Sequence, residues 1–238
     1  MPFAFGTPYI HSAFDVAAWL GSLASFWLTT RYLLPASMLP GRRVEHPGAY
    51  AIAAGSGALC GAMFFGTLNA LLSGQHAIGF SMAGGIAGAI AAVEVFKRLT
   101  GVTGSTGIVF AAPLAITIAI GRIGCFFAGL ADFTYGTATD LPWAVDFGDG
   151  VRRHPVQLYE SLAMAAMAVL VVQRLVAADR YWLANGFYLV VGWYGAQRFV
   201  WEFLKPYAAF IGPFNLFHLV CLGLVLYAGA MIRGGRPR

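Results

Sequence analysis

GRIGCFFAGLADFTYGTATDLPWAVDFGDGVRRHPVQLYE, residues 121–160, is a polar loop flanked by two long apolar runs. It begins with Arg122 inside an apolar run and continues through a segment rich in Gly, Thr and Asp. It closes on Arg-Arg-His-Pro, directly before the next apolar run. So many polar groups at an expected membrane boundary predict a functional site there, with the remaining segments packed around it.

The composition predicts a polytopic helical membrane protein. Of the 238 residues, 59% are apolar and 11% are charged, and the mean hydropathy is +0.71. A soluble domain carries about 25% charged residues. A β-barrel is disfavoured because the apolar runs are long and continuous rather than alternating. The net charge of +5 indicates no nucleic-acid partner, since most Arg and Lys residues lie in short loops without interleaved aromatics.

Seven apolar runs are long enough to span a bilayer, which takes about 20 residues. The expected fold is therefore all-α, with seven transmembrane helices in a single integral-membrane domain covering residues 1–238. The expected spans are Phe14–Leu34, Ala49–Leu72, Gly79–Phe96, Ile108–Phe127, Pro155–Val176, Phe187–Phe203 and Ile211–Ile232.

The distribution of basic residues predicts the orientation, because Arg and Lys accumulate in cytoplasmic loops. With the N-terminus outside and the C-terminus in the cytoplasm, the outer loops hold only Arg152, Arg153 and Lys205. The other loop and terminal basic residues then face the cytoplasm. This topology places residues 121–160 on the outer face. The first residues lack a basic segment and a small-residue cleavage site, so no removable signal peptide is expected.

Two polar groups within the apolar runs are candidates for anion binding. Arg122 costs at least ~2.5 kcal/mol in a hydrocarbon environment, and either snorkelling to the interface or anion binding would offset that cost. Tyr194, Arg198 and Glu202 are spaced by four and share one helix face, with Lys205 one turn further. They form either a self-neutralised pair or a polar stripe that lines a cavity for an anionic group.

The end of the loop supplies a second set of candidates. LPWAVDFGDGVRRHP predicts a short hairpin with a Gly-Asp-Gly turn, and Pro155 suits the first turn of the next helix. His154 is a titratable group at the expected height of the lipid headgroups. Gln157, Tyr159 and Glu160 follow on the first helical turns. Glu160 either binds substrate or simply faces the helix dipole or pairs with Arg152 or Arg153.

Glycines and cysteines give weaker signals. Gly84 and Gly85 permit close backbone approach, either of a lipid headgroup or of a neighbouring helix. Cys60, Cys125 and Cys221 have neither disulfide nor zinc spacing, so no metal site and no cofactor is expected. Cys125 stays open as a covalent nucleophile because Arg122 lies nearby in sequence.

Several blocks together resemble the bacterial phosphatidylglycerol–prolipoprotein diacylglyceryl transferase family. They are GRIGCF, TDLPWAV, RHPVQLYE and YGAQRFVWEFLKP, and the resemblance covers nearly the whole chain. It implies an enzyme of the bacterial inner membrane whose site faces the outer side. In that family, sn-1,2-diacylglyceryl passes from phosphatidylglycerol to a lipobox cysteine thiol. By motif position, Arg122, Tyr194, Arg198 and Glu202 match family residues tied to substrate binding or activity, and Lys205 replaces an Arg.

The chain departs from the family pattern around the acceptor. The family's histidine in the third span corresponds to Ala83, and polar family positions correspond to Cys125, Ala128 and Leu130. His154 is therefore the first candidate base, followed by His76 or His218. A lipobox thiol, another thiol or hydroxyl acceptor, and a non-catalytic lipid-binding protein remain open alternatives.

Overall fold

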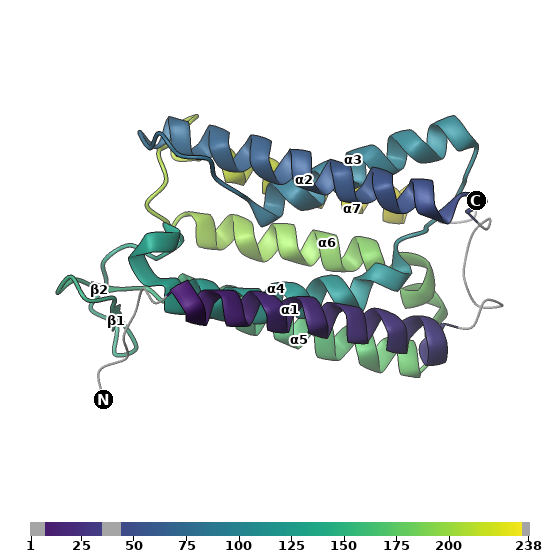
Figure 1. The fold of residues 1–238 in the computed structure, drawn as a ribbon, viewed down its shortest axis with the longest axis horizontal. Helices are drawn as coiled ribbons and strands as arrows, with labels where there is room; N and C mark the ends of the chain where they lie inside the picture. Colours follow the sequence, from purple (N-terminus) through teal and green to yellow (C-terminus); the bar gives the residue numbers. More distant parts are fainter. Residues whose placement is uncertain (1–7, 35–43, 235–238) are drawn as a thin grey trace.

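Seven long α-helices dominate the computed structural model, which describes residues 8–34 and 44–234 (Figure 1). Helix α1 continues into a short π-helical turn, Thr29–Leu33, and a 3-10 turn, η3 (Gly129–Asp132), follows α4. Two short strands, β1 and β2, form a hairpin between η3 and α5. The bounds are α1 Pro8–Leu28, α2 Pro47–Leu72, α3 Met82–Thr100, α4 Ile108–Ala128, β1 Val145–Asp146, β2 Arg152–Arg153, α5 Val156–Val176, α6 Arg180–Glu202 and α7 Leu216–Gly234.

Each expected span coincides with one helix, and the larger differences have local causes. Helix α6 begins at Arg180, seven residues before the expected start, because Asp179 caps it by accepting hydrogen bonds from Tyr181 N and Trp182 N. Helix α7 begins at Leu216, five residues late, because Gly212 has a φ of 57° in the preceding turn. By length and composition, four of the described helices could cross a membrane: α2, α4 with η3, α5 and α7.

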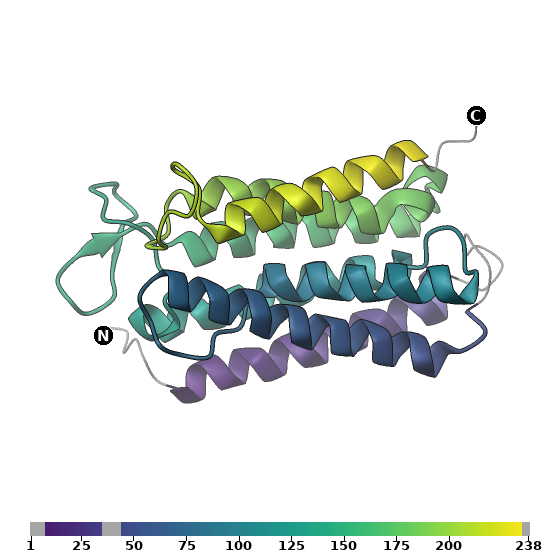
Figure 2. The same cartoon turned by 90° about the horizontal axis from the view of Figure 1, so that it is seen from above.

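The helices run side by side along the long axis of the molecule (Figures 1 and 2). The closest pairs are α2 with α3, α1 with α4, α6 with α7 and α4 with α5. In Figure 1, α6 lies between the α2–α3 pair and the layer of α1, α4 and α5. The hairpin β1–β2 projects from the end of the bundle where α1 begins and α4 ends, and α7 finishes at the opposite end.

Close contact between α2 and α3 depends on glycine. A Cβ added at Gly84 would lie 2.5 Å from Gly61 O and 2.7 Å from Phe65 Cβ, and one at Gly88 would overlap Gly57 O. Small residues let helix backbones approach in this way. Gly84 therefore faces α2, and Gly85 lies beside Ala58 of the same helix, so tight helix packing accounts for this glycine pair.

The loop after η3 forms the expected hairpin. Val145 pairs with Arg153 and Asp146 with Arg152 in antiparallel register. Asp146 Oδ1 accepts from the backbone N of Gly148, Asp149 and Gly150, at 2.8, 3.2 and 3.0 Å. Gly148 and Gly150 have φ values of 105° and 79°, a conformation that favours glycine. The Gly-Asp-Gly turn thus closes the hairpin directly before α5.

Candidate functional site

Five charged side chains meet near the hairpin end of the bundle, and we call them the charge cluster: Arg122, Glu160, Arg198, Glu202 and Lys205. They come from α4, α5, α6 and the segment after α6. All five are at most 7% exposed. Because a buried charge needs an opposite partner, their arrangement is fixed by their mutual pairing.

Glu160 links Arg122 of α4 to Lys205, which follows α6. Its Oε1 accepts from Lys205 Nζ at 2.5 Å, and its Oε2 lies 2.5 Å from Arg122 Nε. The Arg122 contact is an ion pair without hydrogen-bond alignment, so Glu160 Oε2 has no hydrogen-bond donor among the described residues. Of the two explanations for Glu160, pairing with an arginine holds, but the partner is Arg122 rather than Arg152 or Arg153.

Tyr194, Arg198 and Glu202 contact one another along one face of α6, as their spacing predicts. Arg198 Nε donates to Glu202 Oε1 at 2.9 Å, and Arg198 Nη1 donates to Tyr194 Oη at 2.8 Å. Lys205 Nζ lies 3.4 Å from the same Glu202 oxygen. Tyr194 is fully buried, so this face of α6 points into the protein.

Asn215, directly before α7, and His218, in its first turn, close the cluster, whereas the sequence offered His218 only as a candidate base. Asn215 Nδ2 donates to Glu202 Oε2 at 3.2 Å. His218 Nδ1 accepts from Asn215 N, while Asn215 Oδ1 accepts from His218 N. The polar residue before the first turn of α7 was the available signal, because such residues cap helices. His218 itself is enclosed by aromatic rings, at 4.3 Å from Phe203 and 4.9 Å from Phe199 between ring centroids.

Formal charges leave the cluster cationic. Arg122, Arg198 and Lys205 contribute three positive charges and the two glutamates two negative ones, so the net charge is +1. Neither Arg122 Nη2 nor Arg198 Nη2 has a hydrogen-bond partner among the described residues. The cluster can therefore accept one further negative charge.

Gln157 adds an unsatisfied amide beside the cluster. The side chain is fully buried, and neither its Oε1 nor its Nε2 has a hydrogen-bond partner in the described part of the chain. It precedes Glu160 by three residues on α5, so the two share a helix face. A buried amide in this condition calls for a partner such as water or a ligand.

Two of the histidines predicted as candidate bases, His154 and His76, lie in loops between helices. His154 is half-buried and its Nδ1 lies 3.4 Å from Tyr159 Oη. Tyr159 Oη also accepts from Trp143 Nε1 at 2.7 Å. Among the described residues, His154 makes neither an ion pair nor a hydrogen bond with the charge cluster. His76 is exposed on the loop between α2 and α3.

The β1–β2 hairpin has an ion pair that is separate from the charge cluster. Arg153 Nη1 and Nη2 donate to both Asp149 carboxylate oxygens, at 2.6 and 2.7 Å. The hydrogen bonds from Arg153 lower the pKa of Asp149, and the same pairing raises the pKa of Arg153. Arg153 also lies over the Tyr135 ring, 5.2 Å from its centroid. These contacts fix the hairpin shape rather than the charge of the cluster.

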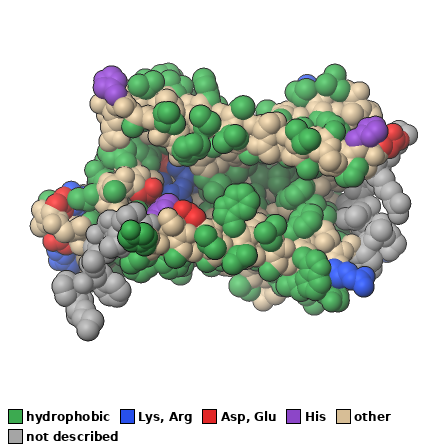
Figure 3. Space-filling model, in the orientation of Figure 1, with side chains coloured by type: hydrophobic (Ala, Val, Ile, Leu, Met, Phe, Trp, Pro, Cys, Tyr) green, Lys and Arg blue, Asp and Glu red, His purple; other side chains and the backbone are tan. Residues whose placement is uncertain are grey.

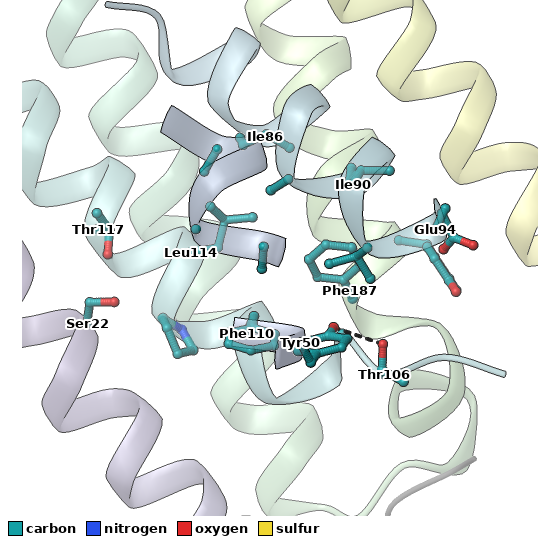
Figure 4. Close-up of a pocket in the computed structure, with 18 of the residues that line it drawn as sticks. Ser22, Tyr50, Ile86, Ile90, Glu94, Thr106, Phe110, Leu114, Thr117 and Phe187 are labelled. Carbon is teal, nitrogen blue, oxygen red and sulfur yellow. Dashed lines mark hydrogen bonds between the residues drawn. The ribbon is translucent and has the colours of Figure 1, made fainter. Parts of the chain in front are cut away.

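An apolar cavity of about 480 Å³ extends toward the opposite end of the bundle and is lined by residues of α1, α2, α3, α4, α6 and α7. Figure 4 shows Ser22 and Thr117 at one end, and Glu94 and Thr106 at the other. Tyr50 Oη bonds Thr106 Oγ1 at 2.9 Å. Thr117 precedes Arg122 by five residues on α4, which is about 7.5 Å of helix rise. The cavity therefore ends close below the charge cluster.

The surface is hollowed between the two rows of helices (Figure 3). Apolar side chains line most of this hollow, and basic, acidic and histidine side chains appear together toward the hairpin end. Charged and apolar surroundings thus adjoin along one side of the molecule.

Fold and site define a class: an all-α membrane protein with a buried, net cationic site at one end of its helix bundle. The family model for prolipoprotein diacylglyceryl transferase matches residues 12–233. The chain therefore belongs to this family of bacterial membrane transferases.

Curated relatives agree with this assignment. A phosphatidylglycerol–prolipoprotein diacylglyceryl transferase of Solidesulfovibrio magneticus is 36% identical, with 83% of each chain covered. Proteins of the same name from Methylobacillus flagellatus and Cupriavidus necator are 30% and 31% identical. The matches cover 87% and 85% of this chain, and 89% and 84% of the relatives. No solved structure matches the chain.

Proposed function

We propose that this chain transfers the sn-1,2-diacylglyceryl group of phosphatidylglycerol to the cysteine thiol of a prolipoprotein. The observation that carries the proposal is the buried charge cluster with its net charge of +1. A phosphodiester carries one negative charge, so the donor headgroup would neutralise the cluster. The names of the curated relatives supply the donor and the acceptor.

We further propose that the chain is one integral-membrane domain of seven spans in the bacterial inner membrane. Its N-terminus is outside, its C-terminus is cytoplasmic and its site faces the outer side. The support is the basic-residue bias together with the position of the charge cluster at the hairpin end. Arg152, Arg153 and Lys205 all belong to that end of the bundle.

In this proposal, Arg122 and Arg198 bind the donor phosphate through their free Nη2 groups. Charge-assisted hydrogen bonds of this kind are roughly twice as strong as neutral ones. Tyr194 and Glu202 hold Arg198 in place, while Glu160 and Lys205 hold Arg122 and balance the charge. Gln157 supplies an amide for a hydroxyl of the glycerol headgroup.

The apolar cavity would take an acyl chain of the donor. From Gly107 to Thr117 it follows α4 for about 15 Å, and its lining is mostly apolar. Its end near Arg122 places such a chain directly below the phosphate. Gly84 and Gly85 contribute through the packing of α3 on α2 rather than through direct headgroup contact.

The chemistry then requires a thiolate and a stabilised leaving group. The acceptor sulfur attacks the sn-3 carbon of the diacylglyceryl group, the carbon–oxygen bond to phosphate breaks, and glycerol phosphate leaves with one additional negative charge. Arg122 and Arg198 stabilise that developing charge. His154, at the outer edge, is the candidate to accept the thiol proton, and Tyr159 Oη lies 3.4 Å from its Nδ1.

Cys125 does not serve as a covalent carrier in this scheme. Transfer to Cys125 would form a thioether, and a second transfer would have to expel a thiolate from carbon. Phosphate is the better leaving group, so direct attack by the acceptor is favoured. Mass spectrometry of the protein during turnover should therefore show no diacylglyceryl adduct on Cys125, whereas a covalent carrier would accumulate one.

The test is transfer from labelled phosphatidylglycerol to a lipobox peptide by purified protein, with mass spectrometry of the peptide and of released glycerol phosphate. Arg122→Ala and Arg198→Ala should lose at least 100-fold in rate, about 2.7 kcal/mol of transition-state stabilisation. Arg174→Ala is the matched control, because Arg174 is exposed at the opposite end of α5. Unchanged transfer by Arg122→Ala would refute the assigned role. Lipid binding without transfer by the wild type would favour the non-catalytic alternative, and lipid on a different acceptor would favour the other-acceptor alternative.

A further inference from the structure

Three potential metal ligands converge beside the charge cluster: His11, Cys125 and Asp132. They come from the first turn of α1, the last turn of α4 and the end of η3. One ligand atom from each lies within 4.8 Å of the other two, and all three residues are half-buried. No sequence spacing predicts this group, because its members are brought together by the packing of α1 on α4.

The contact between α1 and α4 is tight at this point. A Cβ added at Gly124 would lie 2.8 Å from Phe14 Cβ and 3.5 Å from His11 O. Phe14 also stacks on Phe127, with ring centroids 5.5 Å apart. The backbone of His11 is therefore held against α4 next to Cys125, rather than reaching it through a mobile side chain alone.

We propose that His11, Cys125 and Asp132 bind one Zn²⁺ ion with its fourth coordination position open toward the charge cluster. Imidazole, thiolate and carboxylate are the three kinds of zinc ligand in proteins, and three protein ligands with an open position are typical of catalytic zinc sites. In a tetrahedral site neighbouring ligand atoms lie roughly 3.3–3.8 Å apart, from metal–ligand distances of about 2.0–2.3 Å. Shifts of about an ångström in the three ligand atoms would bring them to these separations around the metal.

The outer contacts of two ligands fit this assignment. His11 Nδ1 pairs with Asp15 at 2.9 Å, which leaves Nε2 as the nitrogen for the metal. A carboxylate on the second ring nitrogen is the usual arrangement at zinc-bound histidines. Asp132 Oδ2 accepts from Thr134 Oγ1 at 2.5 Å, and the Asp132 carboxylate also has a side-chain hydrogen bond with Cys125, which shared binding of a metal would replace.

The position of the site suggests what the metal does, and this step rests on the proposed function. Arg122 Nη1 lies 3.9 Å from Cys125 Sγ, so the open position adjoins the donor phosphate. A thiol that binds Zn²⁺ is deprotonated, and its proton passes to His154, the base of the proposed mechanism. The bound acceptor thiolate then attacks the sn-3 carbon as glycerol phosphate leaves. Thiolate from Cys125 and carboxylate from Asp132 cancel the charge of the ion, so the site adds no net charge beside Arg122.

The test begins with metal binding, which does not depend on activity. Protein purified without chelators is analysed for zinc by mass spectrometry, and apoprotein is titrated with Zn²⁺ against a chromophoric chelator. We expect one Zn²⁺ per chain. His11→Ala, Cys125→Ala and Asp132→Ala should each weaken binding at least about 100-fold, and Asp15→Asn 10- to 100-fold, as for an outer-shell partner. Cys60→Ala is the matched control, since Cys60 is exposed on α2, and should bind zinc as the wild type does.

Folding and function are separated by two further measurements. Zn²⁺ should raise the melting temperature of the wild type and of Cys60→Ala but not of folded Cys125→Ser or His11→Gln, because only a specific site stabilises the native state. Transfer by metal-free, chelator-treated wild type at an unchanged rate, or equal zinc binding by wild type and His11→Ala, would overturn the zinc site and leave the transferase proposal standing. One bound zinc without any lipid transfer would overturn the transferase proposal and leave the metal site.

Discussion

Lys205→Met tests whether the charge cluster is held together by mutual neutralisation. Lys205 Nζ contacts Glu160 at 2.5 Å and Glu202 at 3.4 Å, and all three side chains are fully buried. Removing the lysine changes the net charge of the cluster from +1 to 0 and leaves Glu160 with Arg122 as its remaining close cation. Loss of one partner from a buried ion pair costs about 3–5 kcal/mol.

The assay is thermal unfolding in detergent, followed by the fluorescence of the six tryptophans. A chain of this size loses about 2–4 °C in melting temperature per kcal/mol. Lys205→Met should therefore melt roughly 6–20 °C below the wild type. Lys97→Met is the matched control: it removes another buried lysine, paired with Glu94 at 3.1 Å, but Glu94 keeps 25% of its side chain exposed and also accepts from Tyr227. Its cost should be about 1 kcal/mol or less.

A double variant distinguishes charge balance from simple loss of packing. Glu160→Gln alone raises the cluster charge to +2, while Glu160→Gln combined with Lys205→Met restores +1. The double variant should be more stable than the sum of the single effects by about 0.5–3 kcal/mol, the range of coupled neighbours. Single effects that simply add, or a Lys205→Met protein as stable as the wild type, would refute the reasoning.

Three further predictions follow from particular contacts. Gly88→Ala should destabilise the protein by about 1–3 kcal/mol through overpacking against Gly57. Gly55→Ala is the control: its Cβ would meet open space, so it should be neutral or stabilising by up to about 1 kcal/mol. Equal melting temperatures of the two variants would contradict the close contact between α2 and α3. Gln157→Leu should leave stability unchanged or raised, since an unsatisfied buried amide is removed, and should raise the KM for phosphatidylglycerol two- to tenfold for a lost hydrogen bond of about 0.5–1.5 kcal/mol; an unaltered KM in steady-state kinetics would count against headgroup contact. The Asp149–Arg153 pair should stabilise the hairpin fully above the unfolded-state pKa of Asp149, and this stabilisation should be lost as the pH falls through the lowered folded-state pKa. Arg153→Gln should return that pKa toward its ordinary value in a carboxyl NMR titration, and an identical titration curve in both proteins would exclude the pair as the cause.

The helices and the hairpin followed from local sequence. Long apolar runs placed all seven helices, since helix formation and burial in an apolar medium depend mainly on residues near each other in sequence. The turn from Gly148 to Gly150 fixed the hairpin for the same reason. The helix start at Arg180 was missed because the apolar run begins later than the capping residue Asp179.

Part of the charge cluster could also be predicted from the sequence. A spacing of four residues places Tyr194, Arg198 and Glu202 on one helix face whatever surrounds them, and the structure pairs them accordingly. The contact of Glu160 with both Arg122 and Lys205 had no such signal, because it joins α5 to α4 and to the segment after α6.

The sequence by itself therefore determined the family, the helices and the residues that carry charge. Tertiary structure alone decided which charges neutralise each other, that the Gln157 amide is buried without a partner, and that His11 meets Cys125 and Asp132. The physical reason is that the period of a helix fixes neighbours within it, whereas neighbours between helices depend on how far each is rotated and how closely the pair can approach.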